Sequence, residues 1–170
     1  MGLLYLRMSE IRIVRPADIP MLLPLIQAGY PGQELGEQDV EQWLAMAGIH
    51  LVDAPPPDFV VRAYVHLTIN DLSDPIGPVP AGLTTHISSL LPQHHDQAWV
   101  DDVLFPLLIR AIRKRGRESA HMLDRPLYGI LPKTLIPYWE GKLGSIAFGE
   151  KGSRMIYVAT LREAIRKVNV

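Results

Sequence analysis

The sequence predicts an α/β (α+β) fold with a single mixed, mostly antiparallel sheet flanked by helices, and three observations support this. Apolar and polar residues alternate over 59–69, a pattern typical of a half-buried strand. A second strand pattern at 83–88 leads into a long amphipathic helix pattern. Short strand and helix patterns alternate along the rest of the chain, an order that favours one sheet with helices on both sides.

The composition is that of one globular domain. The chain has 170 residues, of which 48% are hydrophobic and 21% charged, and this length suffices for one sizeable core. We therefore expect a single domain over 1–170, with residues 1–9 as an N-terminal extension and Met8 as an alternative start.

Charge and cysteine content exclude several classes of function. A formal net charge of -1 gives no support to nucleic acid or an anionic membrane as partner. The absence of cysteine excludes disulfides, thiolate nucleophiles and cysteine-based zinc sites. No apolar run reaches the length of a membrane span and the start has no signal-peptide pattern, so we expect a cytoplasmic protein.

Two helix patterns lie between the first strand pattern, at 11–14, and the long strand at 59–69. Asp18 is predicted to cap the first helix, and Asp39 to cap a second helix that ends at Gly48. The apolar faces comprise Ile19, Leu22, Leu23 and Ile26 in the first helix and Val40, Trp43, Leu44 and Ala47 in the second. The three prolines at 55–57 are then expected in a loop.

The amphipathic helix after residues 83–88 has the clearest pattern in the chain. Its apolar face comprises Val100, Val103, Leu104, Leu107, Leu108, Ala111 and Ile112. Pro106 is compatible with it only if the regular helix begins close by or is kinked there. Gly116 is expected just past the helix end. A strand that leads into a helix N-terminus can hold a phosphate, although most such units bind nothing.

The two long strand patterns are predicted to pair as an antiparallel hairpin. If the hairpin is centred near Ile76, His66 and His86 lie opposite each other on the less apolar face. Further along, we expect a strand at 120–123, a short helix at 134–143, a hairpin of 145–148 with 155–161, and a closing helix.

Three stretches and this element order resemble the GNAT superfamily of acyl-CoA-dependent N-acetyltransferases. The start IRIVRPADIPMLLPLI is similar to the family's first strand and helix, and YWEGKLGSIAFGEKGSRMIYV to its late segment and terminal hairpin. The strand and amphipathic helix in between match the family's cofactor unit in position. The resemblance implies acetyl-CoA as co-substrate, a small-molecule amine or peptide as acceptor, and a homodimer as a possible assembly.

The chain departs from this family at the signature R/Q-x-x-G-x-G/A, whose glycines admit the coenzyme A diphosphate to backbone N–H groups. His95, Ala98 and Val100 stand at the three signature positions, and no glycine lies between Gly82 and Gly116. The resemblance assigns cofactor binding to Ser89, Leu90, Leu91, His95, Gln97, Ala98 and Val100. Two hypotheses stay open: a divergent acyltransferase, and a non-catalytic relative that acts by ligand binding or dimerisation.

Acyl transfer to an amine needs a proton acceptor, and histidine titrates near neutral pH. His86 and His66 are the candidates, although a histidine on a half-exposed sheet face is more often structural. The resemblance assigns the general acid to Tyr138, with Trp139 as the alternative at that place.

Three other patterns have plainer explanations. His94, His95 and Asp96 are adjacent in sequence, and because adjacent residues rarely converge on one ion we expect no metal site there. The basic run at 113–117 complements the end of a helix. Arg125 and Tyr128 lie where the family's acceptor pocket opens, but a turn also accounts for that segment.

Overall fold

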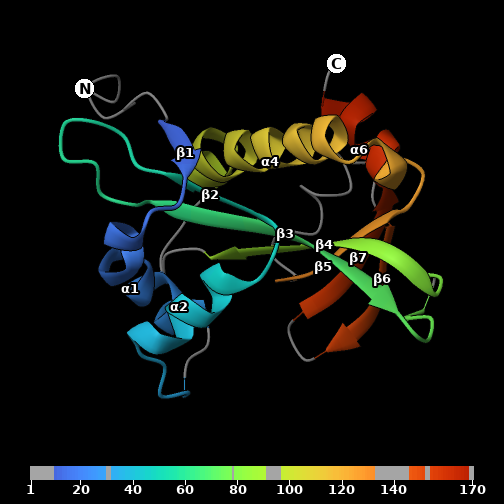
Figure 1. The fold of residues 1–170 in the computed structure, drawn as a ribbon, viewed down its shortest axis with the longest axis horizontal. Coiled ribbons are helices and arrows are strands. Elements are labelled where there is room, and N and C mark those ends of the chain that lie inside the picture. The colour runs from blue at the N-terminus through green and yellow to red at the C-terminus, as the bar shows by residue number, and fades with distance from the viewer. Residues whose placement is uncertain are drawn as a thin grey trace. The chain divides into compact units, whose positions relative to one another are not determined.

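Groups of strands and groups of helices follow one another along the chain (Figure 1). The strands are β1 (Ile11–Ile13), β2 (Ile49–Asp53), β3 (Ala63–Leu72), β4 (Gly82–Leu90), β5 (Pro126–Pro132), β6 (Ile146–Lys151) and β7 (Arg154–Thr160). The helices are α1 (Ile19–Gly29), α2 (Glu37–Ala45), α3 (Gln97–Trp99), α4 (Phe105–Glu118) and α6 (Leu161–Val168). Short 3-10 turns occur at Pro16–Asp18 and Ala120–Met122, and a π-helical turn occurs at Val100–Leu104.

The structure is a computed structural model that describes residues 10–29, 32–77, 79–90, 97–132, 146–151 and 154–168. Contacts divide the chain into two units. Unit 1 comprises Met1–His66 and Ser89–Ala111, and unit 2 comprises Leu67–Ser88 and Ile112–Val170. The boundaries between the units fall inside β3, β4 and α4. The two units are therefore described in turn, and the single domain stays a prediction.

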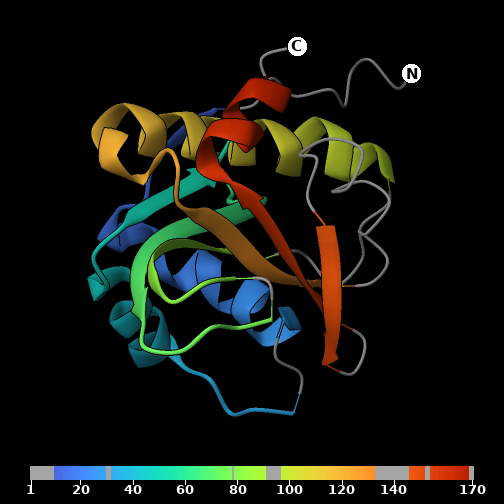
Figure 2. The same ribbon diagram turned by 90° about the vertical axis from the view of Figure 1, so that its right-hand side faces the viewer.

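Within the described residues, the strands form a seven-stranded sheet in the order β1-β2-β3-β4-β5-β7-β6. β1 pairs antiparallel with β2, whereas β4 pairs parallel with β5. β5 pairs antiparallel with β7, which pairs antiparallel with β6, and Figure 2 shows these three strands together. The predicted single mixed, mostly antiparallel sheet is thus confirmed.

In unit 1, α1 and α2 pack on a core that includes residues of β2 and β3. The buried members of this core are Leu22, Leu25, Ile26, Val40, Val52, Ala54, Val61 and Tyr64. The first two helices follow the predicted apolar faces, because those residues recur at helical spacing and can all reach this core.

Both predicted helix caps lie three residues further into their helical segment than expected. Asp39 is the third residue of α2, whose cap position is Gly36, and its Oδ2 accepts the Gly36 N–H at 2.7 Å. Asp18 ends the 3-10 turn before α1, and its carboxylate accepts the Arg15 N–H at 2.7 Å while it pairs with Arg12. A carboxylate at this position accepts the backbone N–H of the cap residue, whereas a side chain at the cap position accepts that of the second or third helical residue.

Strand β2 was not predicted from the sequence, and the strand predicted at 59–69 begins before β3 does. The side chains of β2 are almost all buried, so they lack the alternation that marks a strand with one exposed face. Residues 59–62 precede β3, because Phe59 has a φ of 55° and Val60 is exposed. At the other end of β3, Thr84 Oγ1 donates to the Asn70 carbonyl and Ile76 bridges Val79, which agrees with a hairpin centred near Ile76.

The structure resolves the conflict that Pro106 raised. The regular helix α4 begins at Phe105, so Pro106 lies in its first turn, where the missing N–H costs no helical hydrogen bond. The π-helical turn just before it is closed by the Phe105 N–H, which donates to the Val100 carbonyl. The first of the two predicted alternatives is therefore correct.

Gly116 lies inside α4, contrary to the prediction that it would follow the helix. A Cβ at this position would lie 2.5 Å from Cδ1 of Ile165 on α6, so the missing side chain allows the two helices to approach in unit 2. In the adjoining basic run, Arg115 is buried and donates to the Leu67 carbonyl at 2.7 Å. Lys114 pairs with Glu118 in the last turn.

The predicted strand at 120–123 is wrong. Backbone hydrogen bonds from Met122 to Ser119 and from Leu123 to Ala120 close a 3-10 turn there, and β5 begins at Pro126. The final hairpin of β6 with β7 and the closing helix α6 are confirmed. The predicted helix at 134–143 lies outside the described residues.

Candidate active site

His86 lies in β4 directly beside Tyr128 of β5. The parallel register pairs these two residues, and their rings meet edge to face with centroids 4.9 Å apart. Nδ1 of His86 also lies 3.4 Å from the Ser88 hydroxyl oxygen. Burial lowers the pKa of His86, because the charged imidazolium would lose solvation there. His86 is thus a neutral imidazole at pH 7 and able to accept a proton.

The pairing of β4 with β5 ends one residue after His86 and Tyr128. Within unit 2 the register runs from Thr85–Leu127 to Ile87–Gly129, although β5 continues along β7 to Pro132. Beyond Gly129, the edge of β5 that faces β4 therefore carries backbone N–H and C=O groups. Among the described residues of unit 2, this register gives those groups no partner in β4. A ligand with amide groups could hydrogen-bond to such an edge as an added strand does.

Gly129 allows the close approach of the two strands at this last pair. A Cβ on Gly129 would lie 2.9 Å from the Ile87 carbonyl oxygen, which is a backbone atom and cannot turn away. We expect Gly129→Ala to lower the free energy of unfolding by about 1–3 kcal/mol. Urea unfolding measures this, with Gly36→Ala as control, because nothing lies within 4 Å of a Cβ there. Equal stability of the two variants would show that the close approach is unimportant.

Tyr128 and Arg125, the two residues considered for acceptor contact, have different surroundings. Tyr128 is buried in β5, not in a turn, and its hydroxyl oxygen lies 3.4 Å from the Asn70 amide nitrogen, which donates to it. Arg125 donates to the carbonyls of Leu83 at 2.7 Å and Ala81 at 3.2 Å, so it braces the start of β4. Of the two, only Tyr128 lies beside His86.

His66 has a separate group of partners in unit 1. Its Nδ1 lies 3.0 Å from the Tyr64 hydroxyl oxygen, and its ring meets the edge of Trp43 with centroids 6.1 Å apart. His50 of β2 completes the group on the other side of Tyr64. His50 was not predicted as a candidate, because β2 was not predicted from the sequence. Tyr64 and His66 are two residues apart on one strand, so their spacing could have predicted that both side chains lie on the same face of the sheet.

The residues assigned to cofactor binding are only partly described. Ser89 and Leu90 are the last residues of β4, and Gln97 and Ala98 begin α3, where Ala98 is exposed. Val100 is 1% exposed, so it offers almost no surface to a ligand. Leu91, His95 and the predicted general acid Tyr138 lie outside the described residues.

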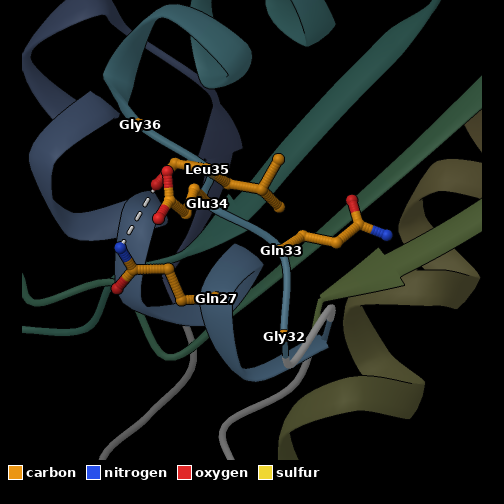
Figure 3. Close-up of a pocket in the computed structure, with 6 residues that line it drawn as sticks. All are labelled: Gln27, Gly32, Gln33, Glu34, Leu35 and Gly36. Carbon is orange, nitrogen blue, oxygen red and sulfur yellow. Dashed lines mark hydrogen bonds between the residues drawn. The ribbon is translucent and has the colours of Figure 1, made fainter.

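A shallow pocket lies between the end of α1 and the segment before α2 in unit 1 (Figure 3). Its lining consists of Gln27 and Gly32, Gln33, Glu34, Leu35 and Gly36. Gln27 donates from its amide nitrogen to the Leu35 carbonyl at 3.3 Å, which holds the loop against the helix. This polar pocket had no predicted counterpart in the sequence.

The described residues contain no group of three or more histidine, cysteine, aspartate or glutamate side chains that could hold a metal ion. In the same part of the chain, every helix is too short or too polar to cross a lipid bilayer.

By sequence, the chain matches no protein-family model and no curated protein. By structure, it is similar to a GNAT superfamily phosphinothricin acetyltransferase from Sinorhizobium meliloti solved in complex with AcCoA. That match has a TM-score of 0.65 and 11% identity, and covers 93% of this chain and 91% of that chain.

Two other solved structures are similar over almost the same length. A ribosomal-protein-alanine N-acetyltransferase from Brucella melitensis has a TM-score of 0.63 and 14% identity, covering 89% of this chain and 99% of that chain. A GNAT-family acetyltransferase from Streptococcus pneumoniae has a TM-score of 0.59 and 13% identity, covering 88% of this chain and 96% of that chain. At these identities the likeness shows the fold, so the chain has the GNAT acetyltransferase fold.

Proposed function

We propose that the chain is a divergent acyl-CoA-dependent N-acyltransferase that moves an acetyl group from acetyl-CoA to an amine. The observation that carries this proposal is the position of His86, a half-buried neutral imidazole one residue before the β4–β5 pairing ends. The fold shared with acetyltransferases, one of them solved with AcCoA, supports the same reaction class.

In this proposal His86 is the general base. The attacking amine must lose a proton as its nitrogen bonds to the acyl carbon, and a neutral histidine beside the reacting atoms can accept that proton. Tyr128 holds the His86 ring edge to face, which restricts its orientation. Bound acetyl-CoA supplies the activated acyl group. Tyr138, as the proposed general acid, gives a proton to the leaving sulfur.

The described residues fit the acyl arm of acetyl-CoA better than its diphosphate. The arm carries amide groups, which the backbone edge of β5 beyond Gly129 could hydrogen-bond. At the helix start, by contrast, the exposed Asp101 and Asp102 put two carboxylates where the proposal places the diphosphate.

The lack of glycine before and at the start of this helix supports a second candidate function. A non-catalytic protein with this fold, acting through ligand binding or dimerisation, needs no glycine-rich loop, and the chain has no glycine between Gly82 and Gly116. The cytoplasmic location, the homodimer and the nature of the acceptor stay predictions under either candidate.

Calorimetric titration with acetyl-CoA separates the two candidates. We expect binding with a Kd on the order of micromolar, and much weaker binding of acetyl-pantetheine, because the diphosphate contributes charge-assisted hydrogen bonds. Absence of binding at millimolar acetyl-CoA would contradict the acyltransferase and support the non-catalytic candidate. Equal binding of acetyl-pantetheine would show that the loop no longer holds the diphosphate.

A further inference from the structure

Ser88 and His86 form a hydrogen-bonded pair on one face of β4 in unit 2. They are two residues apart on the same strand, so their side chains project from the same face of the sheet. The Ser88 hydroxyl oxygen lies 3.4 Å from Nδ1 of His86, whose ring packs against Tyr128 of the same unit. Both side chains of the pair are half-buried, so neither is closed off from solvent.

The Ser88 hydroxyl is the donor in this pair. An imidazole nitrogen binds a proton with a pKa of about 6.5, whereas an alcohol oxygen is a far weaker base, so the shared hydrogen stays on the oxygen and points at the nitrogen. Among the described residues, no group other than Nδ1 of His86 hydrogen-bonds to this hydroxyl. Nδ1 therefore carries the lone pair, and the hydrogen of the neutral ring is on Nε2. The basic nitrogen of His86 thus lies behind the serine hydroxyl.

Ser88 is also the first residue of β4 beyond its described pairing with β5. Within unit 2 the register of the two strands ends at the pair of Ile87 with Gly129. The backbone edge of β5 that this register leaves open begins at the same level of the sheet. In the proposed acetyl transfer this edge binds the amide groups of the acyl arm. Along β4, Ser88 is therefore closer to the acyl group than His86 is.

We propose that Ser88 is a catalytic residue that takes the proton of the amine and passes its own hydrogen to His86. As the amine nitrogen bonds to the acyl carbon and the carbon–sulfur bond breaks, one N–H proton moves to the Ser88 oxygen. The Ser88 hydrogen moves to Nδ1 of His86 in the same step. The serine is then again a neutral hydroxyl, the product amide is neutral, and the positive charge is on the His86 ring. This role rests on the proposed acetyl transfer, in which His86 is the general base.

The surroundings of His86 suit a base that carries charge only briefly. Burial lowers the pKa of the ring, so the imidazolium gives up its proton readily after the transfer. The Tyr128 ring meets His86 edge to face, and the Tyr128 hydroxyl accepts from the Asn70 amide instead of contacting the imidazole nitrogens. In the resting protein, Nδ1 is therefore left to the Ser88 hydroxyl.

The first test is the position of the ring hydrogen on His86, measured by nitrogen-15 NMR of the histidine-labelled protein near pH 8, where the ring is neutral. We expect the hydrogen on Nε2. In Ser88→Ala the Nδ1 resonance should shift, because the nitrogen loses its donor. Ser119→Ala is the matched control, because Ser119 is also half-buried but its side chain makes no capping hydrogen bond. A hydrogen on Nδ1 of His86 in the wild type would overturn the proposal.

The second test measures acetyl transfer in a single turnover. Ser88→Ala should lower the rate about tenfold or more and leave the Kd for acetyl-CoA unchanged, while Ser88→Thr, which keeps a hydroxyl, should retain most of the rate. In mixtures of light and heavy water, the wild-type rate should follow a curve against deuterium content, because two protons move together. The Ser88→Ala rate should follow a straight line. A straight line for the wild type, or a full rate in Ser88→Ala, would overturn the role of Ser88.

The two tests separate this role from the proposed acetyl transfer. If no amine of an acceptor panel is acetylated, the proposed function fails and the catalytic role of Ser88 fails with it. The NMR measurement needs no turnover, so it still decides whether Ser88 donates to His86. If acetyl transfer is observed and Ser88→Ala transfers at the wild-type rate, only the role of Ser88 fails.

Discussion

Replacing His86 with alanine is expected to lower the rate of acetyl transfer by about 10²–10⁴-fold, the contribution typical of a positioned general base. The ring is held against Tyr128 and is only partly buried, so its loss should cost little stability. Release of the coenzyme A thiol, with an amine chosen from an acceptor panel, measures the rate. Thermal unfolding of the same sample checks that the variant is folded.

His121→Ala is the matched control, because His121 is exposed in the turn after α4 and should leave the rate unchanged. The pH profile gives a second readout. The neutral ring is the active form and burial lowers its pKa, so kcat/KM should hold as the pH falls through the usual 6.5 and drop only below it. A fall in kcat/KM centred at or above pH 6.5, or full activity of His86→Ala, would show that His86 is not the general base.

Replacing Asp53 with alanine is expected to lower the free energy of unfolding by about 3 kcal/mol or more. Asp53 is 0% exposed and accepts hydrogen bonds from the Arg62 guanidinium at 2.6 Å and from the Glu10 N–H at 2.9 Å. Its removal leaves both donors without this acceptor, and uncompensated buried polar groups are costly. Denaturant unfolding with an unchanged m-value measures the loss.

Asp124→Ala is the matched control for this prediction. Asp124 also pairs with an arginine, Arg162 at 2.8 Å, but both side chains are largely exposed. Water solvates the separated charges there, so no measurable loss of stability is expected. If the two variants were equally stable, burial would not be the cause of the effect at Asp53.

The local periodicity of apolar residues was sufficient to predict the elements that have one buried and one exposed face. The α4 pattern, the β3–β4 hairpin and the closing helix α6 could be predicted because each alternation repeats within a few residues. The resemblance at both ends of the chain then predicted the GNAT fold, which the structural matches confirm. His86 could be named as a candidate for the same local reason, since the β4 pattern sets its face.

Only the tertiary structure decided the features that depend on contacts between distant segments. β2 is buried on both faces, so no alternation marked it, and His50 was missed with it. Gly116 looked like the end of a helix, but the nearby side chain of Ile165 explains the glycine. Tyr128 became the neighbour of His86 through a parallel pairing of strands far apart in sequence. A sequence pattern records which face of an element is apolar, whereas the partner across that face is chosen by the packing of the whole chain.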